Sequence, residues 1–141
     1  MRHIPGTYPV LAGMELMQCR IITGDVERMA AFYACLVETD VTLNEYYVEV
    51  PAGAAAVGFS RCRFAGFRAG EAMDSAQEPG QIILDFQVDD ADAQYLRIAA
   101  MGVEWVMPPK TQPWGSRAMI FRDPGGHLVN VFSRGEHGIG R

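Results

Sequence analysis

The chain is poor in the residues that build disulfide frameworks and zinc sites. It has three cysteines, an odd number, and no two of them stand in a CxxC pair: Cys19, Cys35 and Cys62. We therefore expect reduced thiols and a cytoplasmic protein. Its three histidines are also scattered, at His3, His127 and His137. Two fall in the terminal tails and His127 falls beside a turn, so we expect all three to be solvated.

Long apolar runs and basic clusters are missing as well. No run approaches the roughly 20 apolar residues of a membrane span. The first 13 residues are interrupted by Pro5, Gly6 and Pro9, unlike the continuous apolar core of a signal peptide. The net charge is −5, with no cluster of Lys and Arg to neutralise phosphates. We expect neither a membrane nor a nucleic acid as partner.

Sequence motifs of common catalytic centres are also absent. The chain contains no GxSxG, no Walker loop, no GxGxxG at the start of a helix and no HExxH. Cys19 alternates to the face of its strand opposite Gln18, where it is expected to be a small core residue. The sequence therefore identifies no catalytic residue.

What the chain does have is a repeated order of elements within 141 residues, the length of one domain. Residues 14–23 predict a strand, and Asp25 then predicts a helix N-cap. Residues 41–60 predict short strands separated by the turn residues Pro51 and Gly53. Residues 61–80, rich in Gly, Ala and charge, predict a mobile loop.

The same order then returns. Residues 81–88 predict a strand, Asp90 the next helix cap and Gly102 the helix end, and 103–107, 117–122 and 127–133 predict three strands. The fold class is therefore α+β, with two βαβββ repeats forming curled mixed sheets. We predict a single domain at 14–134 with halves at about 14–60 and 81–134, an N-terminal extension at 1–13 and a C-terminal tail at 135–141. A doubly wound α/β fold would need more than two helices.

Two segments resemble a known family. Residues 24–33 read GDVERMAAFY, and residues 112–117 and 121–130 read QPWGSR and FRDPGGHLVN. Their order and spacing resemble the vicinal oxygen chelate superfamily, the glyoxalase and bleomycin-resistance fold. The resemblance implies a small-molecule cup in each half and a homodimer. Members include glyoxalase I, extradiol dioxygenases, fosfomycin-modifying enzymes and antibiotic-sequestering proteins, and many hold a divalent metal in the cup.

The metal-ligand positions that the resemblance implies are poorly filled. They fall on Gln18, Ile83 and Asn130, while the fourth lies within 51–60, a stretch without His, Asp or Glu. A catalytic divalent site needs about three His or carboxylate donors. We therefore predict no metal cofactor and disfavour an extradiol dioxygenase. The alternative is a divalent metal held from shifted positions by Gln18, Asp85 and Asn130.

Strand alternation places a set of polar and aromatic side chains toward the cup. Asp85 interrupts a strand otherwise suited to burial, so it must be paired, solvated or functional. It either forms a salt bridge with Arg20 or Arg117 or contacts a ligand. Trp114, between Pro113 and Gly115, either stacks on a ligand or closes the barrel end by packing. The predicted ligand-binding residues are Gln18, Arg20, Asp85, Trp114, Arg117, Asn130 and Phe132.

The resulting hypothesis is a homodimeric, metal-independent protein of the bleomycin-resistance type that binds a flat or partly cationic organic molecule. The Gln-Pro-Trp-Gly loop at 112–115 resembles that of drug-sequestering members, which suggests antibiotic resistance. The alternative is a metal-dependent, glyoxalase-I-like lyase or isomerase with a degenerate ligand set.

Overall fold

A computed structural model describes residues 15–61 and 82–135 of the chain. The predicted extension at 1–13 lies outside the described residues, as does nearly all of the loop predicted at 61–80 and of the tail predicted at 135–141. Among the described residues, no helix is long and apolar enough to cross a membrane.

Two capped helices occupy equivalent places in the two halves. Helix α1 spans Val26–Val37, and the side chain of Asp25 accepts a hydrogen bond from the backbone N–H of Arg28 at 3.2 Å. Helix α3 spans Ala91–Ala100, and Asp90 accepts from the N–H of Ala93 at 3.3 Å. Each carboxylate also lies at the positive end of the helix dipole. The two predicted caps are confirmed.

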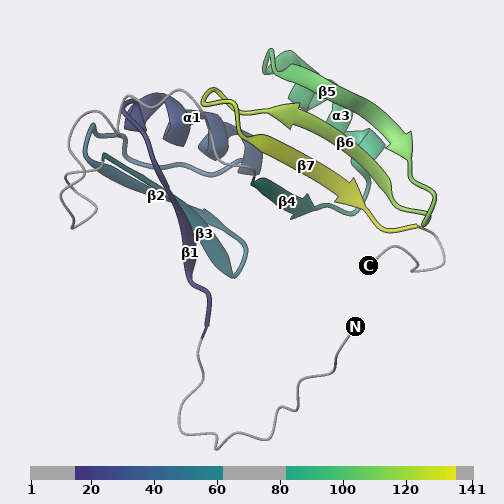
Figure 1. Ribbon diagram of the computed structural model, residues 1–141, viewed down its shortest axis with the longest axis horizontal. Helices are drawn as coiled ribbons and strands as arrows, with labels where there is room; N and C mark the ends of the chain where they lie inside the picture. The colour runs from purple at the N-terminus through teal and green to yellow at the C-terminus, as the bar shows by residue number, and fades with distance from the viewer. Residues whose placement is uncertain (1–14, 62–81, 136–141) are drawn as a thin grey trace, which may run out of the picture.

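The strands form two mixed sheets that lie side by side (Figure 1). The first sheet has the order β1-β3-β2, with β1 at Gln18–Ile22, β2 at Tyr47–Ala52 and β3 at Ala55–Ser60. The second has the order β4-β7-β6-β5, with β4 at Ile83–Gln87, β5 at Glu104–Thr111, β6 at Arg117–Arg122 and β7 at Leu128–Ser133. β1 pairs parallel with β3, and β4 pairs parallel with β7, while the other pairs are antiparallel. The predicted α+β fold of two related halves is confirmed.

The first half has one strand fewer than predicted among the described residues. Residues 41–46, read as part of a strand, form a loop organised by Asn44. Its Oδ1 accepts from the N–H groups of Tyr46 and Tyr47 at 2.8 and 3.0 Å, and its Nδ2 donates to the carbonyl of Tyr47 at 3.1 Å. The Asn44 side chain therefore bonds both the N–H and the carbonyl of Tyr47. These are the backbone groups that a further strand at this edge of the sheet would use for pairing.

The hairpin that follows also differs from the prediction in one detail. Pro51 belongs to β2 and is not a turn residue. It stands on the outermost strand of its sheet, where its missing N–H is tolerated. The turn lies at residues 53–54, where Gly53 has a φ of +67°, the left-handed conformation that glycine adopts readily.

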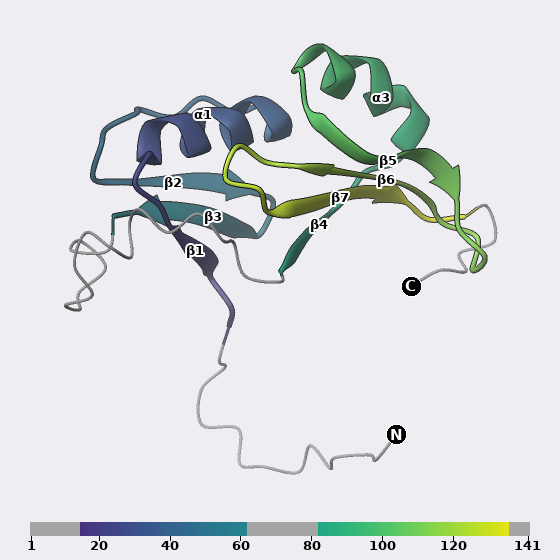
Figure 2. The ribbon, with the colours of Figure 1, turned by 45° about the horizontal axis from the view of Figure 1, so that its top comes forward.

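Both helices cover the same side of the two sheets (Figure 2). In β2 and β3, the buried residues Val48, Val50, Val57 and Phe59 alternate with residues that face away from the helices. The core continues across both halves, because the ring of Tyr33 from α1 stacks on Phe59 and also contacts Phe86 of β4. We call the sheet faces opposite the helices the cup faces. Gln18, Arg20, Tyr47, Glu49 and Gly58 lie on the first, and Asp85, Ala118, Asn130 and Phe132 on the second.

The side chain of Arg97 on α3 forms hydrogen bonds with the C-terminal end of α1. Its guanidinium donates to the carbonyl oxygens of Cys35 and Leu36 at 3.1 and 2.9 Å. The carbonyls in the last turn of a helix lack partners inside the helix and carry partial negative charge, so a cation is favourable there. Arg97 thus contacts residues that precede it by 62 and 61 positions in the sequence.

Candidate functional site

The central feature of the second cup face is a carboxylate beside a carboxamide. Asp85 of β4 and Asn130 of β7 are direct partners in the parallel register. Nδ2 of Asn130 donates to Oδ1 of Asp85 at 2.8 Å. Oδ1 of Asn130 is buried and has no hydrogen-bond partner among the described residues. The Asp85 carboxylate and Oδ1 of Asn130 are both hydrogen-bond acceptors, and the Asn130 oxygen has no donor among the described residues.

These two residues line a cavity of about 230 Å³, which we call the Asp85 cavity. It is bounded by Asp85, Gln112, Trp114, Ser116, Ala118, Asn130, Phe132 and Arg134. Four of the seven predicted ligand-binding residues therefore line one cavity. Arg134, at the end of the described chain, directs its Nε toward Oε1 of Gln87 at 3.4 Å.

Trp114 is held by the turn between β5 and β6. The N–H of Gly115 donates to the carbonyl of Gln112 at 2.9 Å, and the N–H of Gln112 donates to the carbonyl of Ser116 at 2.7 Å. Pro113 stands at the second position of this turn, where its fixed φ is favourable. Trp114 is 55% exposed, so part of its side chain is accessible to a ligand.

Arg117 lies on the other side of its sheet from the Asp85 cavity. The register pairs it with Ser133, whereas Ala118 pairs with Phe132 on the cup face. Its guanidinium forms a bidentate contact with Asp92 in the first turn of α3. Nε and Nη2 donate to the two carboxylate oxygens at 3.1 to 3.2 Å. The alternative of a salt bridge between Asp85 and Arg117 is therefore wrong, and Arg117 joins a helix to its sheet.

Gln18 and Arg20 lie on the first cup face and do not border the Asp85 cavity. Oη of Tyr47 is 3.1 Å from Oε1 of Gln18 and 2.9 Å from Oε2 of Glu49. Sequence reasoning missed Tyr47 and Glu49, although the alternation of β2 would have put them on one face. Ser60, the partner of Tyr47 in the register, is fully buried, and its Oγ has no partner among the described residues.

The metal-ligand positions expected from the family resemblance can now be placed by register. Arg20 pairs with Gly58 in the first half as Asp85 pairs with Asn130 in the second, so Gly58 is the counterpart of Asn130. The four positions thus hold Gln18, Gly58, Ile83 and Asn130. Two carboxamides, a glycine and an isoleucine do not fit a catalytic divalent metal. Within the described ranges, no three His, Cys, Asp or Glu residues gather as a metal-binding group.

Comparison with known proteins agrees with this architecture. A sequence model of the Glyoxalase/Bleomycin resistance protein/Dioxygenase superfamily matches residues 15–131. A search of the curated proteins finds no match.

Several solved structures have the same fold. A glyoxalase/bleomycin resistance protein/dioxygenase from Nocardioides is 18% identical, with a TM-score of 0.73, and the match covers 93% of this chain and 91% of that one. A family enzyme from Burkholderia phytofirmans PsJN is 19% identical, with a TM-score of 0.71 and coverage of 85% and 98%. A lactoylglutathione lyase from Agrobacterium tumefaciens is 20% identical, with a TM-score of 0.65 and coverage of 86% and 94%. At these identities the likeness concerns the fold.

Proposed function

Because the chain belongs to the Glyoxalase/Bleomycin resistance protein/Dioxygenase superfamily, we propose that it binds a small organic cation in the Asp85 cavity without the metal that many members use. The observation that carries this proposal is the Asp85–Asn130 pair. It places a carboxylate beside a buried, unpartnered amide oxygen, and both residues line a cavity that has aromatic residues on its walls. A ligand with N–H donors on a positive group would form charge-assisted hydrogen bonds with the Asp85 carboxylate.

The volume of the cavity and the residues that line it indicate the size and chemical class of the ligand. A volume of about 230 Å³ fits a molecule of about one ring, because drug-sized ligands occupy roughly 300–1,000 Å³. Phe132 and Trp114 offer aromatic surface for a flat ring or a cation. Arg134 also lines the cavity, and its Nε contacts Oε1 of Gln87 at 3.4 Å. We therefore propose a planar, cationic ligand.

The enzyme alternative has weaker support. A lyase or isomerase of the glyoxalase I type would hold a divalent metal through Gln18, Asp85 and Asn130. In the structure, Gln18 contacts Tyr47 on the first sheet, whereas Asp85 and Asn130 contact each other on the second. Only one of these three side chains is a carboxylate, the donor type that a divalent metal prefers over carboxamides.

We also propose a cytoplasmic homodimer. Superfamily members are often dimers, and in the part of the chain that the structure describes each sheet has one helix, on one of its faces. Leu16, Met17 and Ile83, at the start of β1 and of β4, are 84%, 63% and 50% exposed. Apolar surface of this kind is commonly covered by a partner. The drug-sequestering role suggested by the 112–115 loop stays a prediction.

The ligand class is tested with benzamidine, a flat amidinium cation, and with benzamide, its neutral analogue of nearly the same shape. By calorimetry, the protein is expected to bind benzamidine more tightly. Asp85→Asn should weaken benzamidine binding by about 1.5–3 kcal/mol, because it removes a charge-assisted hydrogen bond while keeping shape, and should barely affect benzamide. Asp89→Asn, an exposed charge at the end of the same segment and outside the cavity, is the control. Equal losses in both variants would contradict the proposal.

A further inference from the structure

A second cavity lies between α1 and one end of the second sheet, and we call it the α1 groove. Its volume is about 530 Å³. One wall is formed by residues of α1, and the other by residues 101–104 and 122–124, at the start of β5 and the end of β6. None of the residues that line it borders the Asp85 cavity, and α1 lies on the side of the sheets opposite the cup faces. The groove is therefore separate from the proposed ligand cavity.

The α1 wall is one stripe of the helix, since residues three and four positions apart share a helix face. Four residues with this spacing line the groove: Arg28, Ala31, Phe32 and Cys35. Phe32 is half-buried, and its ring centroid lies 6.4 Å from that of Phe121 in the core. Met101 and Val103 on the other wall are also partly buried against the core. The groove thus has apolar surface on both walls.

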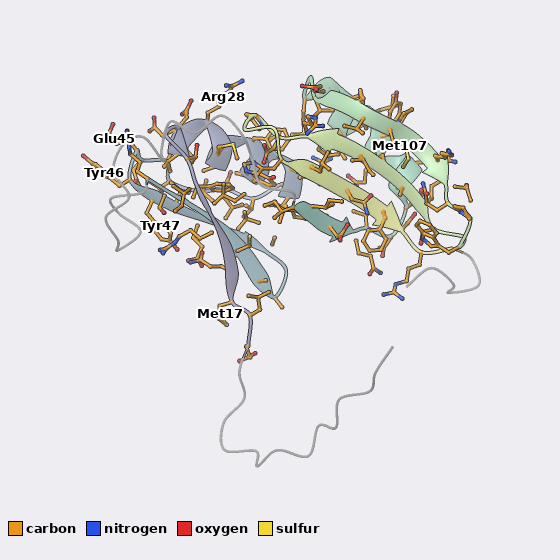
Figure 3. The ribbon with its side chains drawn as sticks, in the orientation of Figure 1. Met17, Arg28, Glu45, Tyr46, Tyr47 and Met107 are labelled. Atoms are coloured by element: carbon orange, nitrogen blue, oxygen red, sulfur yellow. The ribbon has the colours of Figure 1, made fainter. Side chains whose placement is uncertain are left out.

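Two guanidinium groups line the groove, one on each wall. That of Arg28 has no partner among the described residues, and Figure 3 shows its side chain pointing outward from α1. On the other wall, Nη1 of Arg122 donates to the carbonyl of Gly126 at 2.8 Å, and Nε lies 3.6 Å from Oε2 of Glu104. Each guanidinium has five N–H donors. Most donors on both walls therefore lack a protein acceptor in the part of the chain that the structure describes.

The acidic residues of the groove compensate only part of this positive charge. Asp123 also lines it, but its side chain is fully buried and already accepts several hydrogen bonds. Glu104 is exposed and pairs with Arg122. This leaves the charge of Arg28 without a paired carboxylate, in a chain whose net charge is −5. Charge complementarity therefore favours an anion in the groove.

From these features we infer that the α1 groove binds an aromatic carboxylate. The carboxylate accepts hydrogen bonds from the guanidinium of Arg28, and Arg122 supplies further donors across the groove. The aromatic ring packs on Phe32 and on the apolar side chains of the opposite wall. A volume of about 530 Å³ lies within the range of roughly 300–1,000 Å³ that drug-sized ligands occupy. The inference goes beyond the proposed function, which places a cation in a different cavity.

The site is tested by ¹⁵N NMR titration of the full-length protein with cinnamate, and with cinnamamide as its neutral analogue of nearly the same shape. The backbone N–H signals of Ala31 and Gly102 report the two walls of the groove, and the indole N–H of Trp114 reports the Asp85 cavity. Cinnamate should shift the signals of both walls, and cinnamamide should bind there more weakly. Shifts confined to Trp114, or equal affinities of the two probes at Ala31 and Gly102, would overturn the inference. Benzamidine binding at Trp114 tests the proposed function separately.

A pair of charge variants tests the role of Arg28. Arg28→Gln should raise the dissociation constant of cinnamate by about fivefold, the upper end of what an exposed charge pair contributes, and should hardly affect cinnamamide. Lys110→Gln removes an exposed cation outside the groove and should change neither. Losses of the same size in both variants would show that cinnamate responds only to the net charge of the protein, and the inference would be wrong.

A pair of steric variants tests the place of binding. Ala31→Phe fills part of the groove and should abolish the cinnamate shift at Gly102. Ala93→Phe makes the same change at an exposed position of α3 that does not line the groove, and should leave the titration unchanged. Bound cinnamate should also slow the alkylation of the exposed Cys35 thiol by iodoacetamide, measured by peptide mass spectrometry. Cinnamate binding that is unchanged in Ala31→Phe would place the ligand elsewhere and contradict the inference.

Discussion

The hydroxyl of Tyr33 donates a 2.7 Å hydrogen bond to Oδ2 of Asp123, across 90 residues of sequence. It ties α1 of the first half to the turn between β6 and β7 of the second. Asp123 also accepts from Nδ1 of His127 at 3.0 Å and from the backbone N–H groups of Gly125 and His127 at 2.8 and 2.9 Å. His127, expected to be solvated, has a side chain only 12% exposed, so that expectation was wrong.

This contact changes the acidity of both partners. Burial alone raises the pKa of Asp123, but the hydrogen bonds from His127 and Tyr33 lower it, and together they hold the pKa of Asp123 below its ordinary value. Burial, and then the negative charge of Asp123, raises the pKa of Tyr33 well above its usual range. Asp123 is therefore a buried carboxylate and Tyr33 a neutral donor, which is the arrangement of a stabilising contact.

Removing the Tyr33 hydroxyl should destabilise the protein. Tyr33→Phe leaves a buried carboxylate oxygen short of one donor, and we expect the free energy of unfolding to fall by about 1–3 kcal/mol. Tyr95→Phe is the matched control, since the Tyr95 ring packs on Trp105 and its hydroxyl has no partner among the described residues. Urea unfolding of both variants measures the difference. Equal stability in the two would show that the Tyr33–Asp123 bond contributes nothing.

The lowered pKa of Asp123 predicts a loss of stability in acid. The stabilisation is fully present above the pKa of the unfolded state, near 3.8, and is lost as pH falls from there through the lower folded-state pKa. The wild type should therefore lose more unfolding free energy than Asp123→Asn as pH drops below about 4. Parallel pH profiles of the two proteins would contradict this assignment.

Trp114 should affect ligand affinity far more than stability. Trp114→Ala is expected to weaken benzamidine binding by about 1–3 kcal/mol, as loss of an aromatic anchor typically does. Because the side chain is 55% exposed, the melting temperature should barely change. Calorimetry and thermal unfolding of the same variant decide the matter. A fall in stability with unchanged affinity would make Trp114 a packing residue.

Glu38 should show the cost of a left-handed residue at the end of α1. It ends α1 with φ 56° and ψ 52°, a left-handed conformation that glycine adopts at lower cost. Glu38→Gly should therefore be about 1 kcal/mol more stable than Glu38→Ala. Both variants lose the exposed contact with Arg97 at 3.7 Å, so their difference isolates the backbone effect. The prediction fails if chemical denaturation ranks the alanine variant as equally or more stable.

The proposed homodimer has a direct measurement. Sedimentation equilibrium at micromolar concentration should give twice the 15.5 kDa of the chain. Ile83→Lys places a charge on an exposed apolar residue of β4 and should shift the equilibrium toward monomer. Lys110→Gln, an exposed change on the far strand β5, should not. A wild-type monomer would refute the assembly.

The sequence by itself determined the helices, the strand alternation and the two-half order. Asp25 and Asp90 cap their helices because capping depends on the next three residues alone. Alternation likewise put Asp85 on one face of its strand, since side chains along a strand alternate with period two. These features are local, so a pattern of neighbours is sufficient to predict them.

Tertiary structure decided which side chains meet. Asp85 bonds Asn130, and not Arg117, because the β6–β7 register places Arg117 with Ser133 on the helix side. A shift of one residue would have reversed its face, and no local pattern fixes that register. The same holds for Tyr33 and Asp123, which meet only when both halves pack on one core. Side chains far apart in sequence meet through the pairing and packing of whole elements, and that is set by the fold.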